Sequence, residues 1–334
     1  MKKLFIAVLA VAALASCAQD EIITKHNQVA IGFGNAYVDN STKAIITAAN
    51  EIQGFTVWGN VQGTGVDTPV ALYGNTGAAV TREGAALGAA WKCGVVRYWT
   101  AACDYNFVAI ANGTGIDVAN GLPTKISYTV KNDPADLLYG VAAAKTTDEN
   151  VISGDVVTGT GTGTVKSIVA FSLNHLLSRV KVSFQSKLAA DATDYRYTIT
   201  DVKVVTPESG TYTIADNKWA LATTNANLPF TGTEQIPNNS TVDYGAQLVI
   251  PTSQVNLVFT YALELKTGVD ALSGEDIWTP FRTETVTKTG IVTPVKNCSY
   301  NITVVLQAGA KIDFTVKESG GLTDFTPGDD VNVQ

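Results

Sequence analysis

One cysteine lies in a pattern that predicts covalent chemistry. Cys17 follows Leu14, Ala15 and Ser16, and small residues before a cysteine are typical of bacterial sites where a signal peptidase cleaves and lipid is attached. Residues 1–16 have a basic start and an uncharged apolar run, which is shorter than the roughly 20 residues that span a bilayer. We therefore predict a signal peptide over residues 1–16 and a lipid on Cys17 that holds the chain in the outer membrane. The alternative is an ordinary signal with an incidental cysteine.

The other cysteines, Cys93, Cys103 and Cys298, allow two interpretations. An odd number cannot pair completely within one chain. Cys93 and Cys103 flank a short segment that a hairpin disulfide would bridge. The interpretation we favour is three small buried thiols. No two of them have the CxxC spacing typical of zinc ligands, so we predict no metal site.

Two histidines, His26 and His175, are the other candidates for chemistry. His26 lies in a polar stretch and is predicted to be exposed, whereas His175 lies among apolar residues and is predicted to be a structural histidine at a strand edge. The sequence contains no GxSxG, HExxH or P-loop motif. A carboxylate pair for glycoside hydrolysis stays open, but no pair stands out among the acidic residues. We predict that the chain is not an enzyme, has no catalytic residue and needs no cofactor.

Five aromatic residues cluster in one stretch of the sequence: Trp91, Tyr98, Trp99, Tyr105 and Phe107. On a surface, such a cluster would stack against sugar rings. The interpretation we favour is that these side chains alternate into a core.

Composition limits the class of protein and of partner. The chain has 334 residues, of which 46% are hydrophobic and 16% charged, so it is long and apolar enough for two packed domains. The formal net charge is -7. Because phosphate binding needs clustered Lys and Arg, we predict no nucleic-acid partner.

Alternation with a period of two is the dominant pattern, and it indicates strands with one buried face. It marks residues 29–33, 55–57, 105–109, 180–184, 257–263, 300–306 and 312–316. Turn signals such as Asn120-Gly121 and Ser209-Gly210 separate these runs. Many short strands at this spacing favour β-sandwiches.

A run of alternating Thr and Gly over residues 158–164 predicts a domain boundary. We expect a lipidated N-terminal segment with a first strand over residues 17–43. An N-terminal β-sandwich would then cover residues 44–165, and a C-terminal β-sandwich with a tail would cover residues 166–334.

Three stretches together resemble the fimbrillin family, the pilins of Bacteroidales surface fimbriae. The first comprises Ala90-Trp91, Arg97-Tyr98-Trp99 and Tyr105-Asn106-Phe107-Val108-Ala109. The second is Phe171-Ser172-Leu173-Asn174-His175-Leu176-Leu177-Ser178-Arg179-Val180-Lys181-Val182. The third is Leu248-Val249-Ile250-Pro251-Thr252-Ser253, with Tyr300-Asn301-Ile302-Thr303-Val304 further on. They occur in the family's order and span nearly the whole chain.

This resemblance implies a fold and a route of assembly. The fold is two transthyretin-like β-sandwiches in tandem. A lipidated precursor reaches the cell surface, and a trypsin-like protease cuts after a basic residue behind the first strand. The lipid and that strand leave, and a C-terminal strand from another subunit fills the groove. The expected function is that of a structural subunit of fimbriae that contributes to adhesion.

Two stretches of the sequence, one near each end, have the alternation that this route needs. The first strand would present Val29, Ile31 and Phe33 on one face, so that its loss uncovers an apolar groove. The candidate donor strand alternates in the same way. Its apolar residues are Ile312, Phe314 and Val316.

Lys43 is the candidate cleavage site. It lies in a polar segment and is the only Lys or Arg between Lys25 and Arg82. Polar exposed segments are where proteases cut. The family usually has arginine at this point.

Two other functions remain open at this stage. One is a lipid-anchored surface protein that binds a glycan or a host ligand through Trp91 or Trp99 and never polymerises. The other is an accessory or anchor subunit of a fimbria.

Overall fold

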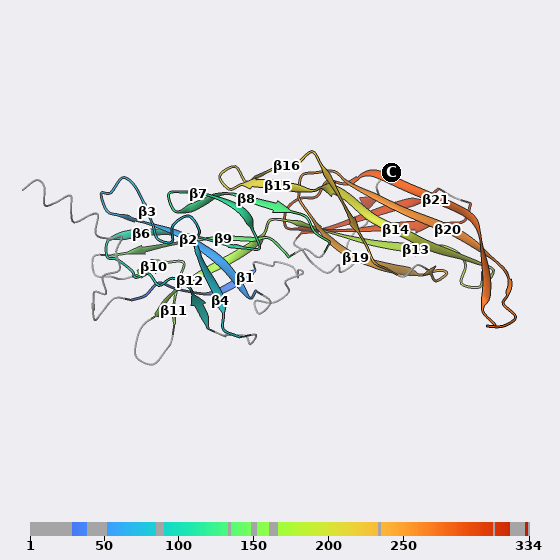
Figure 1. Cartoon of the computed structure of the whole chain (residues 1–334), viewed down its shortest axis with the longest axis horizontal. Coiled ribbons are helices and arrows are strands. Elements are labelled where there is room, and N and C mark those ends of the chain that lie inside the picture. Colours follow the sequence, from blue (N-terminus) through green and yellow to red (C-terminus); the bar gives the residue numbers. More distant parts are fainter. Residues whose placement is uncertain are drawn as a thin grey trace, which may run out of the picture.

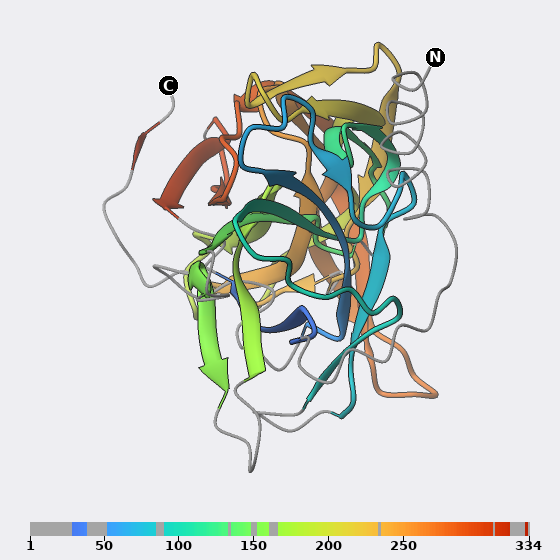
Figure 2. The same ribbon diagram turned by 90° about the vertical axis from the view of Figure 1, so that its left-hand side faces the viewer.

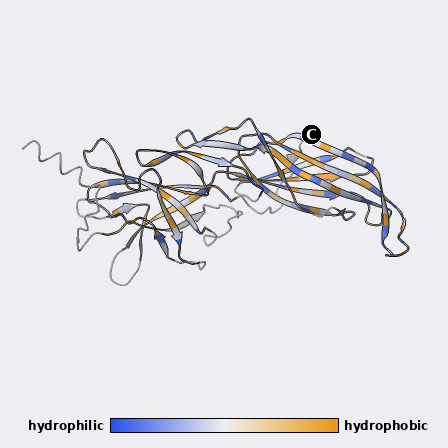
Figure 3. Cartoon of the chain, in the orientation of Figure 1, coloured by the Kyte–Doolittle hydropathy of each residue, from blue (hydrophilic) through white to orange (hydrophobic). Residues whose placement is uncertain are grey.

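The structure is a computed structural model. It describes residues 29–38, 52–84, 90–132, 135–147, 152–159, 166–232, 235–309, 311–320 and 331–332. The described chain consists of strands and loops in an elongated molecule, which confirms the all-β prediction (Figure 1). Apolar and polar residues alternate along the long strands, as expected for strands with one buried face (Figure 3). The predicted signal peptide, Cys17, His26 and Lys43 lie outside the described residues.

The first sheet holds ten strands, nearly all from the first half of the chain. They are β1 (Gly32–Val38), β2 (Gly54–Gly63), β3 (Val70–Ala71), β4 (Ala78–Arg82), β5 (Trp91–Cys93), β6 (Cys103–Ala111), β9 (Leu138–Thr146), β10 (Ile152–Gly154), β11 (Val156–Gly159) and β12 (Lys166–His175). The order is β1-β12-β9-β6-β2-β4-β5, with β3, β10 and β11 paired at the side. Ala30, just before β1, forms a bridge to Tyr98, which follows β5. The two ends of the sheet therefore meet around the first core (Figure 2).

A second sheet combines strands from both halves of the chain. It contains β7 (Thr114–Ala119), β8 (Leu122–Thr129), β15 (Ser209–Thr213) and β16 (Lys218–Leu221), in the order β16-β15-β8-β7. The central pair, β8 and β15, joins Ile126 to Tyr212. Both side chains are buried in the second core. The two halves are thus connected by a ladder of backbone hydrogen bonds as well as by the covalent chain.

The remaining strands form two facing sheets around the second core. One sheet contains β13 (Ser178–Ser186), β19 (Thr241–Val249), β22 (Cys298–Leu306), β23 (Asp313–Gly320) and β24 (Val331–Asn332), in the order β19-β13-β22-β23-β24. The other contains β14 (Tyr195–Pro207), β17 (Asn225–Pro229), β18 (Gln235–Ile236), β20 (Val255–Val269) and β21 (Asp276–Val292), in the order β17-β14-β20-β21 with β18 against β14. Phe184 of one sheet and Phe259 of the other meet with ring centroids 5.0 Å apart.

Two expectations differ from what is observed. The boundary expected after residue 165 precedes β12, whose Phe171 and Leu173 pack in the first core. The second core also takes in residues from before that boundary, such as Trp58, Val108 and Ile126. The turn predicted at Ser209-Gly210 is wrong, because both residues lie in β15. The division into two transthyretin-like sandwiches stays a prediction, since one of the four sheets belongs to both halves.

Replacing Ile126 with Ala should lower the free energy of unfolding by about 2–5 kcal/mol, because the side chain is fully buried between strands of both halves. Urea unfolding followed by fluorescence should still give one transition, shifted as a whole. The control Val141→Ala, at an exposed position of β9, should change the free energy of unfolding by less than about 0.5 kcal/mol. Two separate transitions, of which only one moves, would contradict the coupling of the halves.

Candidate strand-exchange site

The first strand lies between two walls of backbone. On one side β1 pairs with β12 in parallel, with Phe33 opposite Val169. On the other side the Trp99 amide donates to the Val29 carbonyl at 3.0 Å, and the Ile31 amide donates to the Arg97 carbonyl at 2.8 Å. We call the space that residues 29–34 fill between β12 and residues 97–99 the β1 seat.

The apolar face of this segment completes the first core. Phe33 is 4% exposed, and its ring centroid lies 5.6 Å from that of Phe107, 6.0 Å from that of Tyr73 and 6.1 Å from that of Phe171. Ile31 is also buried, and Val29 is half-buried against the same core. The structure therefore brings Val29, Ile31 and Phe33 together on one face, as the alternation predicts.

The β1 seat leaves little room for a side chain at Gly34, the residue that follows Phe33. A Cβ atom on Gly34 would lie 3.1 Å from Cγ2 of Ile168 and 3.3 Å from Cδ1 of Trp91. Both contacts are tighter than a side chain normally makes, so a strand in the seat needs a small residue at this point or a shift of its neighbours.

The wall at residues 97–99 is held by groups outside β1. The Thr100 amide donates to the Tyr105 hydroxyl at 2.6 Å, and this hydroxyl donates to the Thr100 carbonyl at 3.3 Å. The rings of Trp99 and Tyr105 meet at 4.7 Å. Burial raises the pKa of Tyr105 and of Tyr73, so both hydroxyls are neutral at physiological pH. This wall is therefore also held by contacts other than those with the first strand.

The candidate donor strand lies far along the chain, in β23. This strand pairs with β22 over residues 313–320, with Phe314 opposite Val304. Val316 is buried, and Ile312 and Phe314 are half-buried against the second core. The structure thus places the donor candidate in its own C-terminal sheet, between β22 and the short strand β24, and it does not bring it to the β1 seat of the same chain.

The aromatic cluster belongs to the first core, as predicted. Trp99, Tyr105 and Phe107 are buried, and Trp91 is half-buried with its ring 5.4 Å from Phe55. Tyr98 is the exposed member. Trp91 and Trp99 therefore do not form an open platform for a sugar ring.

His175 is a structural histidine, as predicted, but its partner could not be read from the sequence. Its Nδ1 pairs with Oδ2 of Asp136, and both side chains are buried. Asn112 Nδ2 donates to the Asp136 carbonyl at 2.8 Å. The pair holds the end of β12 against the start of β9.

No disulfide is found among the described cysteines. Cys93 and Cys103 are half-buried, and burial raises the pKa of both thiols. Their sulfurs lie near the backbone oxygens of Val95 and Ala101. The described residues also contain no group of three or more His, Cys, Asp or Glu side chains that could hold a metal ion.

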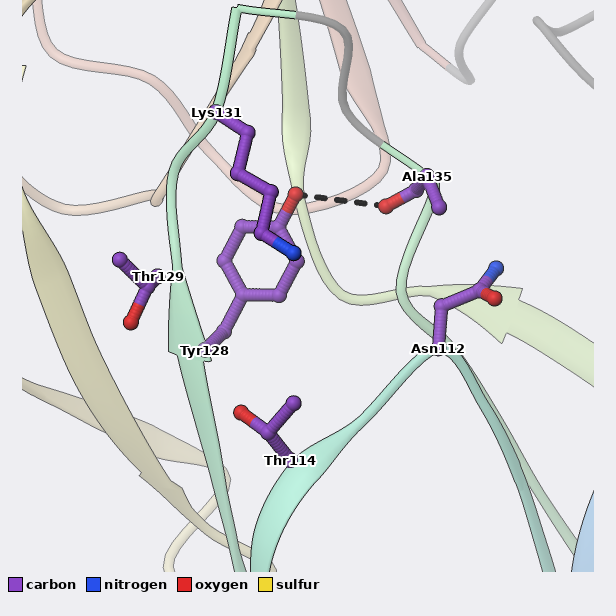
Figure 4. A pocket seen from close by; sticks show the side chains of 6 residues that line it. All are labelled: Asn112, Thr114, Tyr128, Thr129, Lys131 and Ala135. Carbon is purple, nitrogen blue, oxygen red and sulfur yellow. Dashed lines mark hydrogen bonds between the residues drawn. The ribbon is translucent and has the colours of Figure 1, made fainter.

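A polar cavity of about 220 Å³ lies at the edge of β7 and β8. It is lined by Asn112, Thr114, Tyr128, Thr129, Lys131 and Ala135, and the Tyr128 hydroxyl donates to the Ala135 carbonyl at 3.3 Å (Figure 4). Its lining offers hydrogen bonds and one cation. Among the described residues, the lining includes no carboxylate, histidine or thiol.

Replacing Phe33 with Ala should lower the free energy of unfolding by about 3–5 kcal/mol, because a buried aromatic side chain leaves a cavity among three rings. The measurement is urea unfolding of the intact chain. Val96→Ala, at an exposed position near the same wall, is the control and should change little. Equal stability of Phe33→Ala and the unmodified chain would contradict the role of this ring in the first core.

In the part of the chain that the structure describes, no helix is long and apolar enough to cross a membrane.

Comparisons with known proteins agree with the architecture. A model of the fimbrillin-like family matches residues 42–323. Among solved structures, a fimbrial protein from Bacteroides vulgatus is similar, with 14% identity, a TM-score of 0.62 and coverage of 89% of this chain and 100% of that one. The fimbrial anchor protein Mfa2 from Porphyromonas gingivalis is 11% identical over 89% of this chain and 99% of that one, with a TM-score of 0.36. No curated protein sequence matches. The family model covers most of the chain, and the chain therefore belongs to the fimbrillin-like family.

Proposed function

We propose that this protein is a structural subunit of surface fimbriae that polymerises by strand exchange after proteolysis and contributes to adhesion. In this proposal the precursor is anchored in the outer membrane by lipid on Cys17, and a trypsin-like protease cuts after Lys43. The observation that carries the proposal is the placement of β1. This strand ends at Val38, before Lys43, so one cut would separate it covalently from the core that it completes.

The physical drive for exchange comes from the vacated seat. Without β1, the rings of Phe107 and Phe171 lose their contact with Phe33, and one edge of β12 loses its hydrogen-bond partners. Burying one large apolar side chain is worth about 1.5–3 kcal/mol. Each recovered ladder hydrogen bond adds about 1 kcal/mol net. An empty seat should therefore bind a replacement strand by β-strand addition.

The proposed replacement is β23 of another copy. Ile312, Phe314 and Val316 repeat the apolar spacing of the first strand. To leave its own sheet, β23 gives up its ladder with β22, its short pairing with β24 and the contact of Phe314 with Phe259. The exchange therefore replaces the backbone hydrogen bonds of β23 in its own sheet with those in the β1 seat of another copy. Burial of the exposed apolar side chains in that seat makes the exchange favourable. Leu322 and Phe325, which continue the apolar pattern, lie outside the described residues.

The rival function, a lipid-anchored glycan or host-ligand binder that never polymerises, needs an exposed aromatic platform. Burial of Trp99 removes that platform, so we favour the fimbrial subunit. An anchor subunit would differ from a stalk subunit in keeping its first strand, and the cleavage experiment separates these roles.

Mild trypsin treatment of the purified precursor should cut after Lys43 and convert monomers into oligomers. N-terminal sequencing gives the cut, and light scattering with electron microscopy gives the size. Lys43→Gln is the control and should stay intact and monomeric. Cleavage at Lys43 with no change in size would argue against a stalk subunit. Surface material from cells that still carries residues 17–43 would point to an anchor or a receptor.

Phe314→Asp in the full chain should block assembly after cleavage, because a charge would enter the apolar seat. Phe314→Leu is the control and should still assemble. Since Phe314 also packs against Phe259, thermal unfolding of each uncleaved variant must show that it is folded.

A synthetic peptide of residues 311–320 avoids this complication. Added to the cleaved chain after the N-terminal fragment has been removed in mild denaturant, it should bind and stop polymerisation. The same peptide with Phe314→Asp should bind at least about tenfold more weakly, a difference of about 1.4 kcal/mol. A peptide of residues 29–38 should compete for the same site. Equal binding of the Phe and Asp peptides would remove β23 as the donor.

A further inference from the structure

A part of the β20–β21 hairpin projects beyond the second core. β14 stops pairing with β20 at Tyr195, opposite Leu265, and along residues 266–278 the hairpin has no third strand within the described chain. It forms the right-hand end of the molecule (Figure 1). We call residues 266–278 the arm and residues 279–281, which lie opposite strand residues paired with β14, its base. Because two-stranded ribbons are marginally stable in water, a projecting arm needs an anchor at its base.

Charged groups supply that anchor. The Arg196 guanidinium donates to Glu264 at 2.5 Å and lies over the Trp278 ring, 4.4 Å from its centroid. Lys266 pairs with Asp276 at 2.6 Å across the two strands. The base of the arm is therefore held in place from both strands and from β14.

The arm presents apolar side chains to solvent. Leu272 at the turn is 100% exposed, and Val269 and Ile277 are about half exposed. Phe281, in the bulge at the base of the arm, is 73% exposed. No described residue of the same chain covers them. Exposed apolar residues gathered on one projecting element mark a contact surface for another molecule.

Further exposed apolar residues lie in β3 and just before it, toward the opposite end of the molecule (Figure 1), and in residues 96–98, which are hydrogen-bonded to the segment after β3. They are Val66, Val70, Val96 and Tyr98, which we call the N-terminal patch. Its two segments are joined by a hydrogen bond from Arg97 Nε to the Leu72 carbonyl at 2.7 Å. The backbone of Tyr98 also forms part of the wall of the β1 seat, through its bridge to Ala30.

The donor strand begins beside the base of the arm. Leu306 and Ile312, on either side of the turn that leads into β23, line a small cavity together with Leu263 and Arg282 of the hairpin. A tail that leaves this turn to enter the seat of another copy would bring its own arm toward that copy's N-terminal patch. The donor strand thus begins next to one exposed apolar surface, the arm, and the β1 seat lies next to the other, the N-terminal patch.

We propose that the arm of one copy docks on the N-terminal patch of the next copy in the fimbria. This inference rests on the proposed function. The two surfaces differ and lie toward opposite ends of the chain, so the contact is heterologous and repeats along an open filament. It would fix the orientation of neighbouring subunits, which a single exchanged strand leaves adjustable.

Photocrosslinking tests the contact directly. Benzoylphenylalanine replaces Leu272, and the protein is mixed with isotope-labelled copies, cleaved and irradiated. Crosslinked peptides should join position 272 of one copy to residues 64–72 or 95–98 of another, in assembled material only. The control carries the same photoreactive residue at Val295, which is also exposed but belongs to neither surface, and should give no such peptides.

Substitutions give a second readout. Leu272→Ser with Phe281→Ser should slow assembly at least about tenfold, and Val70→Ser with Tyr98→Ser should do the same. All four changes together should be no worse than either pair, because both pairs remove one contact. Val295→Ser is the matched control.

The outcomes separate the two proposals. Normal assembly of the serine variants, or filaments in which position 272 crosslinks elsewhere or not at all, would overturn the docking of the arm and leave strand exchange standing. Failure of the unmodified cleaved chain to assemble would overturn strand exchange, and the docking with it.

Discussion

The packing of Phe33 among Tyr73, Phe107 and Phe171 is the constraint on which the first half of the molecule depends. Rings from β6, β12 and the loop after β3 converge on a position that a short segment at the front of the chain must occupy. The core is therefore complete only while some strand lies in that place. The structure satisfies this need with β1, which is far in sequence from its ladder partner β12.

The two walls of the seat run in opposite directions relative to β1. The pairing with β12 is parallel, whereas the bridge between Ala30 and Tyr98 is antiparallel. Whichever way a strand enters, it meets one parallel and one antiparallel neighbour. Backbone hydrogen bonding thus does little to choose a direction. The side chains must therefore decide which strand fits the seat and in which direction. The seat requires two or three apolar residues at alternate positions, and a small residue where Gly34 approaches Ile168 and Trp91.

The sequence predicted those elements whose pattern is local. Strands through Phe55, Tyr105, Val180 and Phe259 follow from period-two alternation, and the Asn120-Gly121 turn follows from residues that adopt positive φ, as both do. The buried aromatic cluster and the apolar face of the first strand were predictable for the same reason.

What could not be predicted is which strands meet. The parallel pairing of β1 with β12 and the pairing of β8 with β15 join segments far apart in sequence, and alternation carries no register between them. Gly210 resembles a turn residue. It lies in β15 instead, and the reason for glycine there is a close approach of the neighbouring strand. A Cβ at this position would come within 3.1 Å of the Ala220 carbonyl and of the Trp219 ring.

The ladder between β8 and β15 has a mechanical consequence. The seat belongs to the first core and β23 to the second, so a pull applied at these two places crosses the junction between the halves. There the tension is shared between the covalent link after β12, five antiparallel residue pairs that include buried Ile126 and Tyr212, and the packing of first-half residues such as Trp58 in the second core. Antiparallel hydrogen bonds and buried side chains must therefore break together before the two halves can separate, so this junction should resist extension better than a single covalent linker.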